Sequence, residues 1–332
     1  MPPSASGRMI SHYRLLEKLG EGGVGEVYRA EDTVLRRIVA LKFLHSKGDA
    51  ERSLNERFLR EAQAGAALEH QNICPTYGIE DHGGQTFIVM GYVDGEPLSA
   101  RIKKGLKLGE ALDIAIGVGE GLDYAHQNGV IHRDVKAANI LLTKTGVPRI
   151  SDFGIARIEK RSRLTTPGAV IGTVNCMAPE QLMAGEVDRR TDIWALGVLL
   201  YHMLTGRRPF SRGNVGKTIN AILREAAPDA SAADARLPPE LCGIAVKAMS
   251  KAREDRYQHA GEMVVDLRRV KTALSPEQSS MTLHSVEAVE PSSRTVTLAP
   301  GWLPAAKLKW PVLALLAVLL AVLMMVLFSM RR

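Results

Sequence analysis

The sequence predicts an α+β protein with a small β-rich lobe, a larger α-rich lobe and a C-terminal transmembrane helix. Three observations support this fold class. Short apolar segments surround a glycine-rich turn within residues 13–93, segments with helical spacing follow within 94–272, and an uncharged apolar run lies at 311–329. The 332 residues are 45% hydrophobic and 24% charged, so the chain can build a globular core.

The first lobe is expected to be a sheet with one helix. Segments 13–19 and 26–31 flank the glycine-rich turn, and 37–44 reads as a third apolar strand. Residues 86–90 read as a short buried strand. Residues 55–68 instead repeat apolar side chains at i, i+4 and i+7 or i+8, which predicts a helix.

The second lobe is expected to be mostly helical. Residues 108–128 and 260–274 have the apolar spacing of amphipathic helices, whereas 193–205 is apolar almost throughout and reads as a central buried helix. After this lobe, residues 273–310 are rich in Ser, Thr, Pro and Glu and read as a disordered linker. Residues 1–12 form an N-terminal tail.

The apolar run at 311–329 is expected to cross a membrane. Its 19 residues carry no charge and are long enough to span a hydrocarbon core of about 30 Å. A buried core helix is the alternative, and it fits less well because the run has no polar stripe. Only residues 330–332 follow, so we expect a tail anchor; basic residues on both sides leave its orientation open.

Composition argues against several other classes of protein. The net charge is +7 with no block of five basic residues, so we expect no nucleic-acid partner. The three cysteines contain no CxxC pair, which argues against a zinc site and a disulfide framework. The N-terminus has no apolar stretch that would indicate a signal peptide.

A glycine motif lies between the first two expected strands. Gly20, Gly22 and Gly25 form a GxGxxG pattern, which dinucleotide-binding folds also use. In those folds the loop runs into a helix, whereas here residues 26–30 are strand-like. Glycines in a hairpin allow backbone N–H groups to approach phosphates closely, so the motif indicates a phosphate-binding hairpin.

A strand lysine and a helix glutamate come next along the chain. Lys42 ends the apolar stretch Val-Ala-Leu-Lys, and Glu61 lies within the helix expected at 55–68. A glutamate that faces the strand can hold the lysine ammonium against α- and β-phosphates. Each residue alone could simply be a solvated surface charge. Their occurrence together favours the interpretation as a phosphate-holding pair.

The most specific pattern begins with the His-Arg-Asp stretch at 132–134 and extends to residue 154. Asp134 can accept or orient a hydroxyl proton, Lys136 can neutralise a transferred phosphoryl group, and Asn139 can bind Mg²⁺. Asp152 opens an Asp-Phe-Gly triplet thirteen residues after Asn139 and offers a second hard oxygen ligand. Together these motifs indicate phosphoryl transfer.

In this order, the motifs resemble the eukaryotic-like (Hanks-type) Ser/Thr protein kinases, most closely the membrane-anchored bacterial members. The resemblance covers residues 13–272. It implies the bilobal protein-kinase fold, with ATP and Mg²⁺ bound between an N-lobe at 13–93 and a C-lobe at 94–272. The residues that it places in the chemistry are Asp134 and Lys136 for catalysis, Lys42 and Glu61 as the activating ion pair, and Asn139 and Asp152 as Mg²⁺ ligands.

The same resemblance implies a set of nucleotide contacts. Four apolar side chains would sandwich the adenine, Met90 would be the gatekeeper and residues 91–93 would form the hinge. The implied set is Leu19, Gly20, Glu21, Gly22, Gly23, Val24, Gly25, Glu26, Val27, Ala40, Lys42, Met90, Val93 and Leu141.

Other matches and departures bear on the substrate. Lys136 and the Gly-Thr pair ending at Thr173 are typical of Ser/Thr kinases, so protein Ser/Thr hydroxyls are the expected acceptors. Glu180 is expected to pair with Arg256, and Asp192 to brace the catalytic loop.

Cys176 stands where relatives usually have Tyr, which leaves the peptide preference open. It is either a redox-sensitive thiol or a small filler.

Regulation is expected in the segment after the Asp-Phe-Gly triplet. Arg133 precedes the catalytic aspartate, and a phosphothreonine can neutralise such an arginine. We expect activating autophosphorylation on Thr165 or Thr166, with Thr173 as a further candidate and a kinase dimer as one route in trans. Gly65, one turn after Glu61, is expected to hold that helix loosely.

Two rival functions remain from sequence alone. A membrane-bound pseudokinase scaffold would not need the intact catalytic set, and a small-molecule kinase would not need the peptide-docking segment at 173–180. Because a kinase needs cytosolic ATP, we expect a single-pass protein of the cell membrane with its catalytic domain in the cytoplasm.

Overall fold

The computed structural model describes residues 7–22, 25–44, 65–153, 174–183 and 185–283. The chain divides into two units, Met1–Glu287 and Ala288–Arg332, and every described residue belongs to the first. No helix within the described ranges is long and apolar enough to cross a membrane. The span predicted at 311–329 lies outside these ranges, as do residues 55–64 of the helix expected at 55–68.

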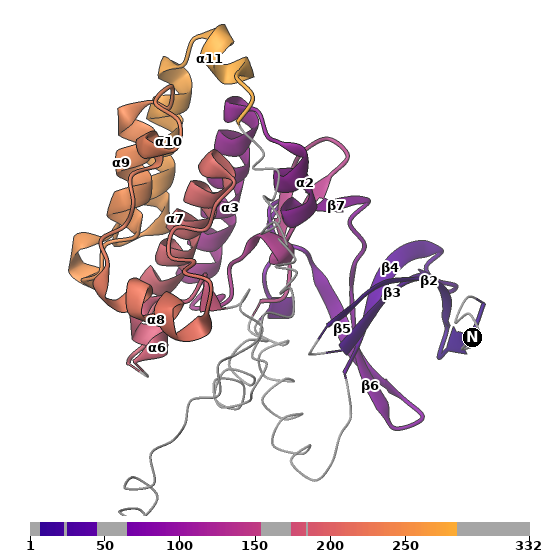
Figure 1. The fold of residues 1–332 in the computed structure, drawn as a ribbon. Helices are drawn as coiled ribbons and strands as arrows, with labels where there is room; N and C mark the ends of the chain where they lie inside the picture. Colours follow the sequence, from indigo (N-terminus) through magenta and orange to yellow (C-terminus); the bar gives the residue numbers. More distant parts are fainter. Residues whose placement is uncertain (1–6, 23–24, 45–64, 154–173, 184, 284–332) are drawn as a thin grey trace, which may run out of the picture. The chain divides into compact units, whose positions relative to one another are not determined.

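The N-terminal lobe is an antiparallel six-stranded sheet with strand order β1-β2-β3-β4-β6-β5 (Figure 1). The β2–β3 hairpin carries the glycine motif and pairs Gly22 with Gly25. The strands predicted at 13–19, 26–31, 37–44 and 86–90 are confirmed. The six strands are β1 (Met9–Ile10), β2 (Tyr13–Gly22), β3 (Gly25–Asp32), β4 (Arg37–Leu44), β5 (Thr76–His82) and β6 (Gln85–Gly91).

Alternation along β4 divides the side chains between two faces. Val39, Leu41 and Phe43 are buried in the sheet's own apolar cluster, where the Phe43 ring lies 5.2 Å from the Phe87 ring. Because side chains alternate along a strand, Ala40 and Lys42 project from the opposite face. Both are also buried, so this second face is covered as well.

A second sheet of three short strands carries the catalytic region. It consists of β7 (Gly95–Pro97), β8 (Ile140–Thr143) and β9 (Pro148–Ile150) in that order. Backbone hydrogen bonds tie β9 to the segment before β5: the Ile150 N–H donates to the Asn72 carbonyl, and the Cys74 N–H donates to the Ile150 carbonyl, both at 2.8 Å. These bonds fix the catalytic region against the N-terminal lobe.

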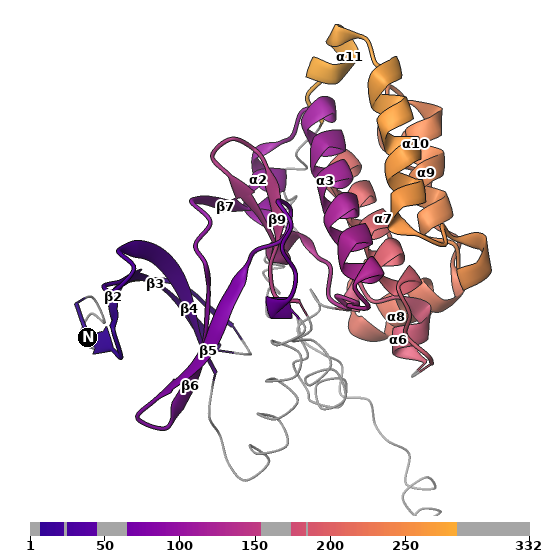
Figure 2. The same ribbon diagram turned by 180° about the vertical axis from the view of Figure 1, so that it is seen from behind.

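The C-terminal lobe is helical, as predicted. Helix α3 packs against α7 on one side and α10 on another, and the three lie side by side in both ribbon views (Figures 1 and 2). Its α-helices are α2 (Leu98–Lys104), α3 (Leu108–Gln127), α6 (Pro179–Leu182), α7 (Arg190–Thr205), α8 (Val215–Arg224), α9 (Pro239–Ala248), α10 (Ala260–Ala273) and α11 (Pro276–Ser280). Three short 3₁₀ turns, η1 (Ala137–Asn139), η2 (Ala230–Ala232) and η3 (Arg253–Asp255), complete it.

Helix α7 is the centre of this lobe. Of its 16 residues, 14 are buried, which confirms the buried helix predicted at 193–205. Trp194 is fully buried and stacks on Phe210, with ring centroids 5.4 Å apart. Most of this helix therefore faces protein rather than solvent, and its polar residues must find partners inside the lobe.

The packed lobe continues past residue 272, where the linker was expected to begin. After α10 the chain forms α11 and then returns to the start of α3. The Leu108 N–H donates to the Met281 carbonyl at 2.9 Å, and the Leu283 N–H donates to the Leu106 carbonyl at 2.7 Å. Leu283 is only 1% exposed. Residues 273–283 are thus part of the folded lobe.

Candidate active site

A buried aspartate on α7 holds the catalytic loop by its backbone. Asp192 accepts hydrogen bonds from the N–H groups of His132, at 2.8 Å, and Arg133, at 2.7 Å. The same carboxylate lies 2.8 Å from His126 Nε2. Burial raises the pKa of Asp192, but the bonds from His126 and His132 outweigh it and lower the pKa below its usual value. This confirms the predicted brace.

His132 connects the catalytic loop to the Asp-Phe-Gly segment. Its Nδ1 accepts the Asp134 N–H at 3.1 Å, so Nε2 carries the proton and donates to the Ser151 carbonyl at 2.9 Å. The Phe153 ring lies edge-on to His132, 4.7 Å away, and is buried. A Cβ on Gly65 would lie 3.6 Å from Phe153 Cβ, so Gly65 packs directly on this phenylalanine.

Three of the predicted site residues, Asp134, Lys136 and Asn139, contact one another within a short loop. Lys136 Nζ lies 2.7 Å from Asp134 Oδ2. Asn139 Nδ2 donates to the Asp134 backbone carbonyl at 2.9 Å and to its carboxylate at 3.2 Å. Asn139 sits at the end of η1 and is buried. The Asp134 carboxylate is thus oriented by an amide and an ammonium group on its own loop.

Lys42 reaches across from β4 to the Asp-Phe-Gly segment. Its Nζ lies 2.6 Å from Asp152 Oδ1, and Lys42 is 6% exposed. Burial raises the pKa of Asp152, yet the neighbouring Lys42 ammonium brings the pKa below its usual value. The backbone of Asp152 is left-handed, with φ of 64°. Glu61, the partner predicted for Lys42, lies outside the described residues.

The donor set fits Mg²⁺ that is shared with phosphate oxygens. Asp152 supplies a carboxylate and Asn139 an amide oxygen, both hard ligands. Among the described residues no group of three His, Cys, Asp or Glu side chains could enclose an ion. A two-residue site matches an ion that takes its remaining ligands from nucleotide and water.

The predicted adenine contacts come from neighbouring strands. Ala40 on β4 pairs with Met90 on β6, and Val27 on β3 pairs with Lys42. Leu141 lies on β8, in the other sheet. Ala40 is 6% exposed, while Val27, Met90 and Leu141 are half-buried. Val93, in the segment after β6, is half-buried too.

The hairpin predicted to cover phosphates is described except at its tip. Lys18 on β2 bridges two glutamates, with Nζ 2.6 Å from Glu21 Oε2 and 2.7 Å from Glu26 Oε1. Leu19 is 45% exposed. The pair with Glu26 fastens β2 to β3 beside the glycines, while Gly23 and Val24 lie outside the described residues.

A bidentate ion pair between Arg256 and Glu180 anchors the short helix α6. Arg256 Nη1 and Nη2 lie 2.9 and 3.0 Å from the two oxygens of Glu180, as the sequence indicated. Thr191 Oγ1 donates to the same carboxylate at 2.7 Å. From the residue after Glu180 on α6, Gln181 Nε2 donates to the Arg133 carbonyl at 2.9 Å. Helix α6 is therefore tied to both the lobe core and the catalytic loop.

The predicted regulatory threonines lie outside the described residues. This applies to Thr165, Thr166 and Thr173. The description resumes at Val174, which is buried, and Cys176 is half-buried against the main apolar cluster. That packing favours the role of a small filler for Cys176.

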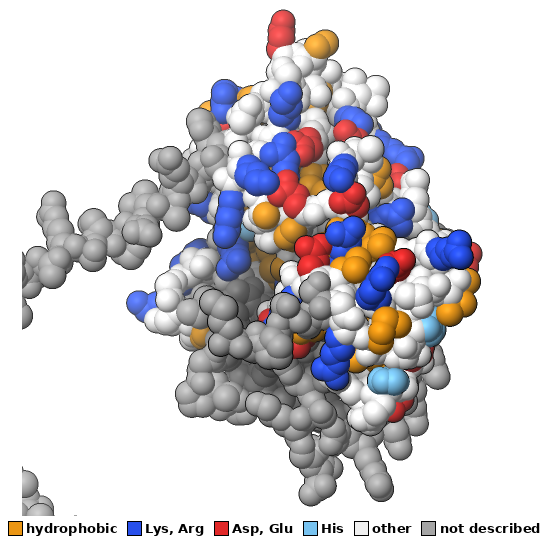
Figure 3. All heavy atoms as spheres, turned by 90° about the vertical axis from the view of Figure 1, so that its right-hand side faces the viewer, with side chains coloured by type: hydrophobic (Ala, Val, Ile, Leu, Met, Phe, Trp, Pro, Cys, Tyr) orange, Lys and Arg blue, Asp and Glu red, His pale blue; other side chains and the backbone are white. Residues whose placement is uncertain are grey.

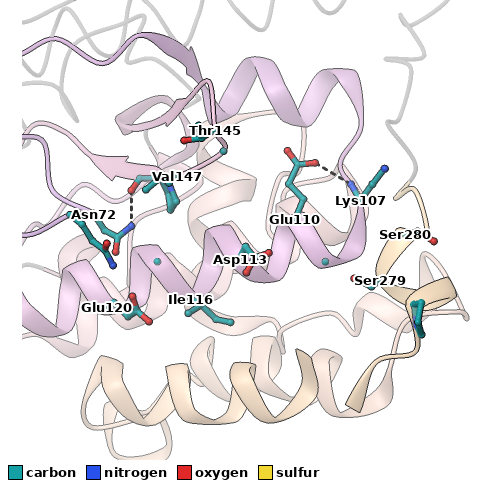
Figure 4. Close-up of a pocket in the computed structure, with 16 residues that line it drawn as sticks. Asn72, Lys107, Glu110, Asp113, Ile116, Glu120, Thr145, Val147, Ser279 and Ser280 are labelled. Carbon is teal, nitrogen blue, oxygen red and sulfur yellow. Dashed lines mark hydrogen bonds between the residues drawn. The ribbon is translucent and has the colours of Figure 1, made fainter. Parts of the chain in front are cut away.

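A wide hollow of about 800 Å³ lies on the helical lobe, apart from the catalytic loop (Figure 4). Figure 4 shows Glu110, Asp113 and Glu120 along α3 on one side and Ser279 and Ser280 on the other. The three acids already pair with basic side chains, which are Arg101, Lys271 and Arg268. Size alone therefore does not mark the functional site here.

Two contacts were missed from the sequence. His126 supports Asp192 from α3, and Cys74 Sγ donates to the Gly91 carbonyl at the hinge, at 3.1 Å. Neither residue lies in a motif. His126 is 66 positions from its partner, so only the tertiary fold brings the two together.

The comparisons with known proteins agree with this geometry. Residues 13–265 match the protein kinase domain family (Pkinase). The match covers more than half of the chain, and the chain therefore belongs to the protein kinase family.

Among its relatives are bacterial Ser/Thr kinases. The chain is 39% identical over 268 residues to a protein of Streptomyces coelicolor named probable serine/threonine-protein kinase, covering 78% of this chain and 40% of the relative. It is 38% identical over 280 residues to PknD of Mycobacterium tuberculosis, covering 83% and 42%. The chain thus spans about two fifths of these relatives. A crystal structure of the M. tuberculosis PknI kinase domain superposes with a TM-score of 0.66 at 31% identity, covering 81% of this chain and 99% of that one.

Proposed function

We propose that this chain transfers the γ-phosphoryl group of ATP to Ser and Thr hydroxyls of proteins. The contact of Asp134 with Lys136 and Asn139 carries the proposal, because it orients a carboxylate beside a cation where an acceptor hydroxyl would lie. Membership of the protein kinase family, with relatives named Ser/Thr kinases, supports it.

Each residue has a defined part in that reaction. The acceptor oxygen bonds to the γ-phosphorus as the bond to the β–γ bridging oxygen breaks, and ADP leaves. Asp134 orients the hydroxyl and takes its proton, while Lys136 neutralises charge on the phosphoryl oxygens. Lys42 holds the α- and β-phosphates. Asn139 and Asp152 would hold Mg²⁺, which supplies positive charge between the phosphates.

The resting contact of Lys42 with Asp152 must change when nucleotide binds. Mg²⁺ bound to the Asp152 carboxylate would place a second cation beside the Lys42 ammonium, which lies 2.6 Å from that carboxylate, and the two like charges would repel. We therefore infer that Lys42 moves from Asp152 to the phosphates, which frees the carboxylate for Mg²⁺. The exchange replaces one cation at Asp152 by another, so the half-buried carboxylate remains neutralised throughout.

Transfer of radiolabel from γ-labelled ATP to a protein substrate tests the proposal. The full chain with Mg²⁺ should label a mixed protein substrate, and labelled acid hydrolysates should contain phosphoserine or phosphothreonine. Asp134→Asn keeps the size of the side chain and should lower kcat by at least about 10²-fold. Equal labelling by both proteins would instead indicate the pseudokinase scaffold with a contaminating activity.

We further propose activating autophosphorylation on Thr165 or Thr166, with Thr173 as the third candidate. The support is Arg133 beside the catalytic aspartate, because phosphothreonine pairs readily with arginine. Two copies of the chain would act on each other in trans. Mass spectrometry of the protein after incubation with ATP identifies the sites. Full activity of a Thr165→Ala/Thr166→Ala variant would contradict the proposal.

We also propose that residues 311–329 anchor the protein in the cell membrane, with the kinase domain in the cytoplasm. The support is the uncharged 19-residue run and the need for cytosolic ATP. Alkaline carbonate extraction should leave the protein in the membrane pellet. Release as soluble protein would refute the anchor, and protease protection in sealed vesicles reports the side.

A further inference from the structure

An arginine-rich hollow follows the C-terminal end of α7. It measures about 490 Å³, and three of its seven lining residues are Arg207, Arg208 and Arg212. The others are Tyr201, Pro209, Ser211 and Pro228, so no carboxylate lines it. We name these residues the arginine pocket.

Two of these arginines lack the ion pairs that many other cations of the described residues make. On the face in Figure 3, basic and acidic side chains lie next to one another over the helical lobe. Ion pairs such as Arg101 with Glu110, at 2.8 Å, are examples of this pattern. The guanidinium groups of Arg207 and Arg208 are exposed and have neither an ion pair nor a hydrogen bond within the described part of the chain. No described residue therefore competes with an external anion for these two guanidinium groups.

The backbone that carries them is fixed. Helix α7 ends at Gly206, which has a left-handed φ of 68° and donates its N–H to the His202 carbonyl at 2.9 Å. Thr205 Oγ1 accepts the Arg207 N–H at 3.1 Å and donates to the Tyr201 carbonyl at 2.9 Å. These bonds tie the start of the turn to the end of α7, which reduces the entropy lost on binding.

The third arginine, Arg212, is held in place by polar contacts with Glu225 and with two backbone carbonyls. Arg212 Nε and Nη2 lie 3.1 and 2.7 Å from Glu225 Oε2, and its Nη1 donates to the carbonyls of Pro209 and Ser211 at 3.1 and 3.0 Å. Glu225 is thereby committed to Arg212. Asp229, one residue after the pocket residue Pro228, accepts the Ser231 N–H at 2.9 Å. The acids nearest the pocket are therefore already engaged with other groups.

Helix α7 also connects the pocket to the active site. Asp192, near its start, holds the catalytic loop, and Tyr201 lines the pocket nine residues later. At 1.5 Å per residue this separation is about 14 Å along the helix. An extended peptide advances about 3.3 Å per residue, so a segment of a few residues is long enough to cover a separation of this order.

We propose that the arginine pocket binds a phosphorylated or acidic side chain of the protein substrate, a few residues from the accepting hydroxyl. A guanidinium group matches the geometry of phosphate and carboxylate oxygens, and phosphate carries nearly two charges at neutral pH. The inference rests on the proposed kinase function and specifies its substrate class.

Peptides with one threonine acceptor in an alanine and glycine background test this inference on the full chain. Phosphoserine, aspartate or lysine is placed in turn at each position up to seven residues on either side. Phosphoserine in the favoured register should raise kcat/KM about tenfold, the ratio that one charge-assisted hydrogen bond supplies, and aspartate should raise it less. The gain should appear in KM rather than kcat.

Matched variants test whether the peptide preference depends on the arginine pocket or on the overall positive charge of the protein. Arg207→Ala/Arg208→Ala should abolish the preference and leave neutral peptides unaffected, and Arg207→Glu/Arg208→Glu should shift it toward lysine. Arg268→Ala/Arg269→Ala removes the same charge from exposed positions on α10 and should retain the preference. Equal kcat/KM for acidic and neutral peptides, or equal loss in the α10 variant, overturns the proposal.

A binding measurement makes its failure distinguishable from failure of the kinase function. Fluorescence anisotropy with a labelled phosphopeptide, whose acceptor threonine is alanine, reports the pocket without catalysis. If no peptide is labelled above the Asp134→Asn blank, the proposed function fails, while anisotropy still tests the pocket. Binding of anionic lipid vesicles that requires Arg207 and Arg208, without any phosphopeptide binding, would overturn the peptide assignment.

Discussion

At the scale of single residues, the buried charges of this protein are stabilised by named partners. Glu180 is 6% exposed, and burial alone would raise its pKa. Hydrogen bonds from Arg256 and Thr191 outweigh burial, so the pKa of Glu180 lies below its ordinary value of 4.5. Because the folded state holds this carboxyl at a lowered pKa, its contribution to stability is present above that ordinary value and is lost as pH falls through the folded pKa.

Replacing Glu180 therefore has an effect that depends on pH. Glu180→Gln leaves the Arg256 charge buried without its carboxylate and should reduce the free energy of unfolding at pH 7 by about 3 kcal/mol. Urea titrations should show the gap to the wild type shrinking as pH falls below about 4.5. Glu254→Gln, at a position whose side chain is 72% exposed, is the control and should change stability little. A gap that stays constant down to pH 3 would contradict this account.

The three thiols should differ in reactivity. Burial raises the pKa of Cys74 to about 12 and that of Cys242 to about 11. At pH 8 only about one Cys74 thiol in 10⁴ would then be ionised, whereas Cys176 is half-buried. A colorimetric thiol reagent should label one cysteine in the folded protein and three in denaturant. Cys176→Ser should remove the fast labelling, and fast labelling that persists would identify another thiol.

At the scale of elements, the contact of Gly65 with Phe153 predicts a stabilising substitution. A Cβ at this helical position would stand at ordinary contact distance from Phe153, and alanine favours a helix over glycine by about 1 kcal/mol. Gly65→Ala should raise the melting temperature by a few degrees. Gly117→Ala is the opposite control, since its Cβ would come within 2.7 Å of Pro148 Cγ, and it should destabilise. Lower stability of Gly65→Ala would show that the helix end cannot accept a side chain.

Elements with a strong apolar period were predictable, and those formed by long-range contacts were not. The densely apolar stretch at 193–205 predicted a buried helix, because such a stretch is stable in few environments other than a protein interior. Strand β5 has a mixed polar pattern, so only pairing with β6 makes it a strand. Helix α11 is five residues long and forms within a stretch whose composition indicates a linker.

At the scale of the whole molecule, Leu283 closes the packed lobe. Its side chain is 1% exposed, and its N–H donates to the Leu106 carbonyl near the start of α3. Leu283→Ala in the full chain should reduce the free energy of unfolding by about 2 to 3 kcal/mol. Val265→Ala, at a position 57% exposed, should change it by less than about 0.5 kcal/mol. Equal unfolding curves for both variants would show that the segment does not contribute to stability.

The candidate site was predictable to the extent that its residues lie in motifs. Asp134, Lys136 and Asn139 are five positions apart at most, so their contact follows from local chain geometry. The pairing of Lys42 with Asp152 spans 110 positions. Spacing alone had indicated a glutamate as the partner of Lys42, and only coordinates reveal this additional contact.

The position of Asp192 has a consequence for local dynamics. Its carboxylate binds the amides of His132 and Arg133 from α7, a helix with 14 of its 16 residues buried. These amides can exchange with deuterium only when that contact opens, and the carboxylate itself is 0% exposed. The catalytic loop should therefore exchange as slowly as the lobe core, although loops ordinarily exchange quickly. In this protein, opening of the catalytic loop at these two amides would require the Asp192 contact to break inside the lobe core.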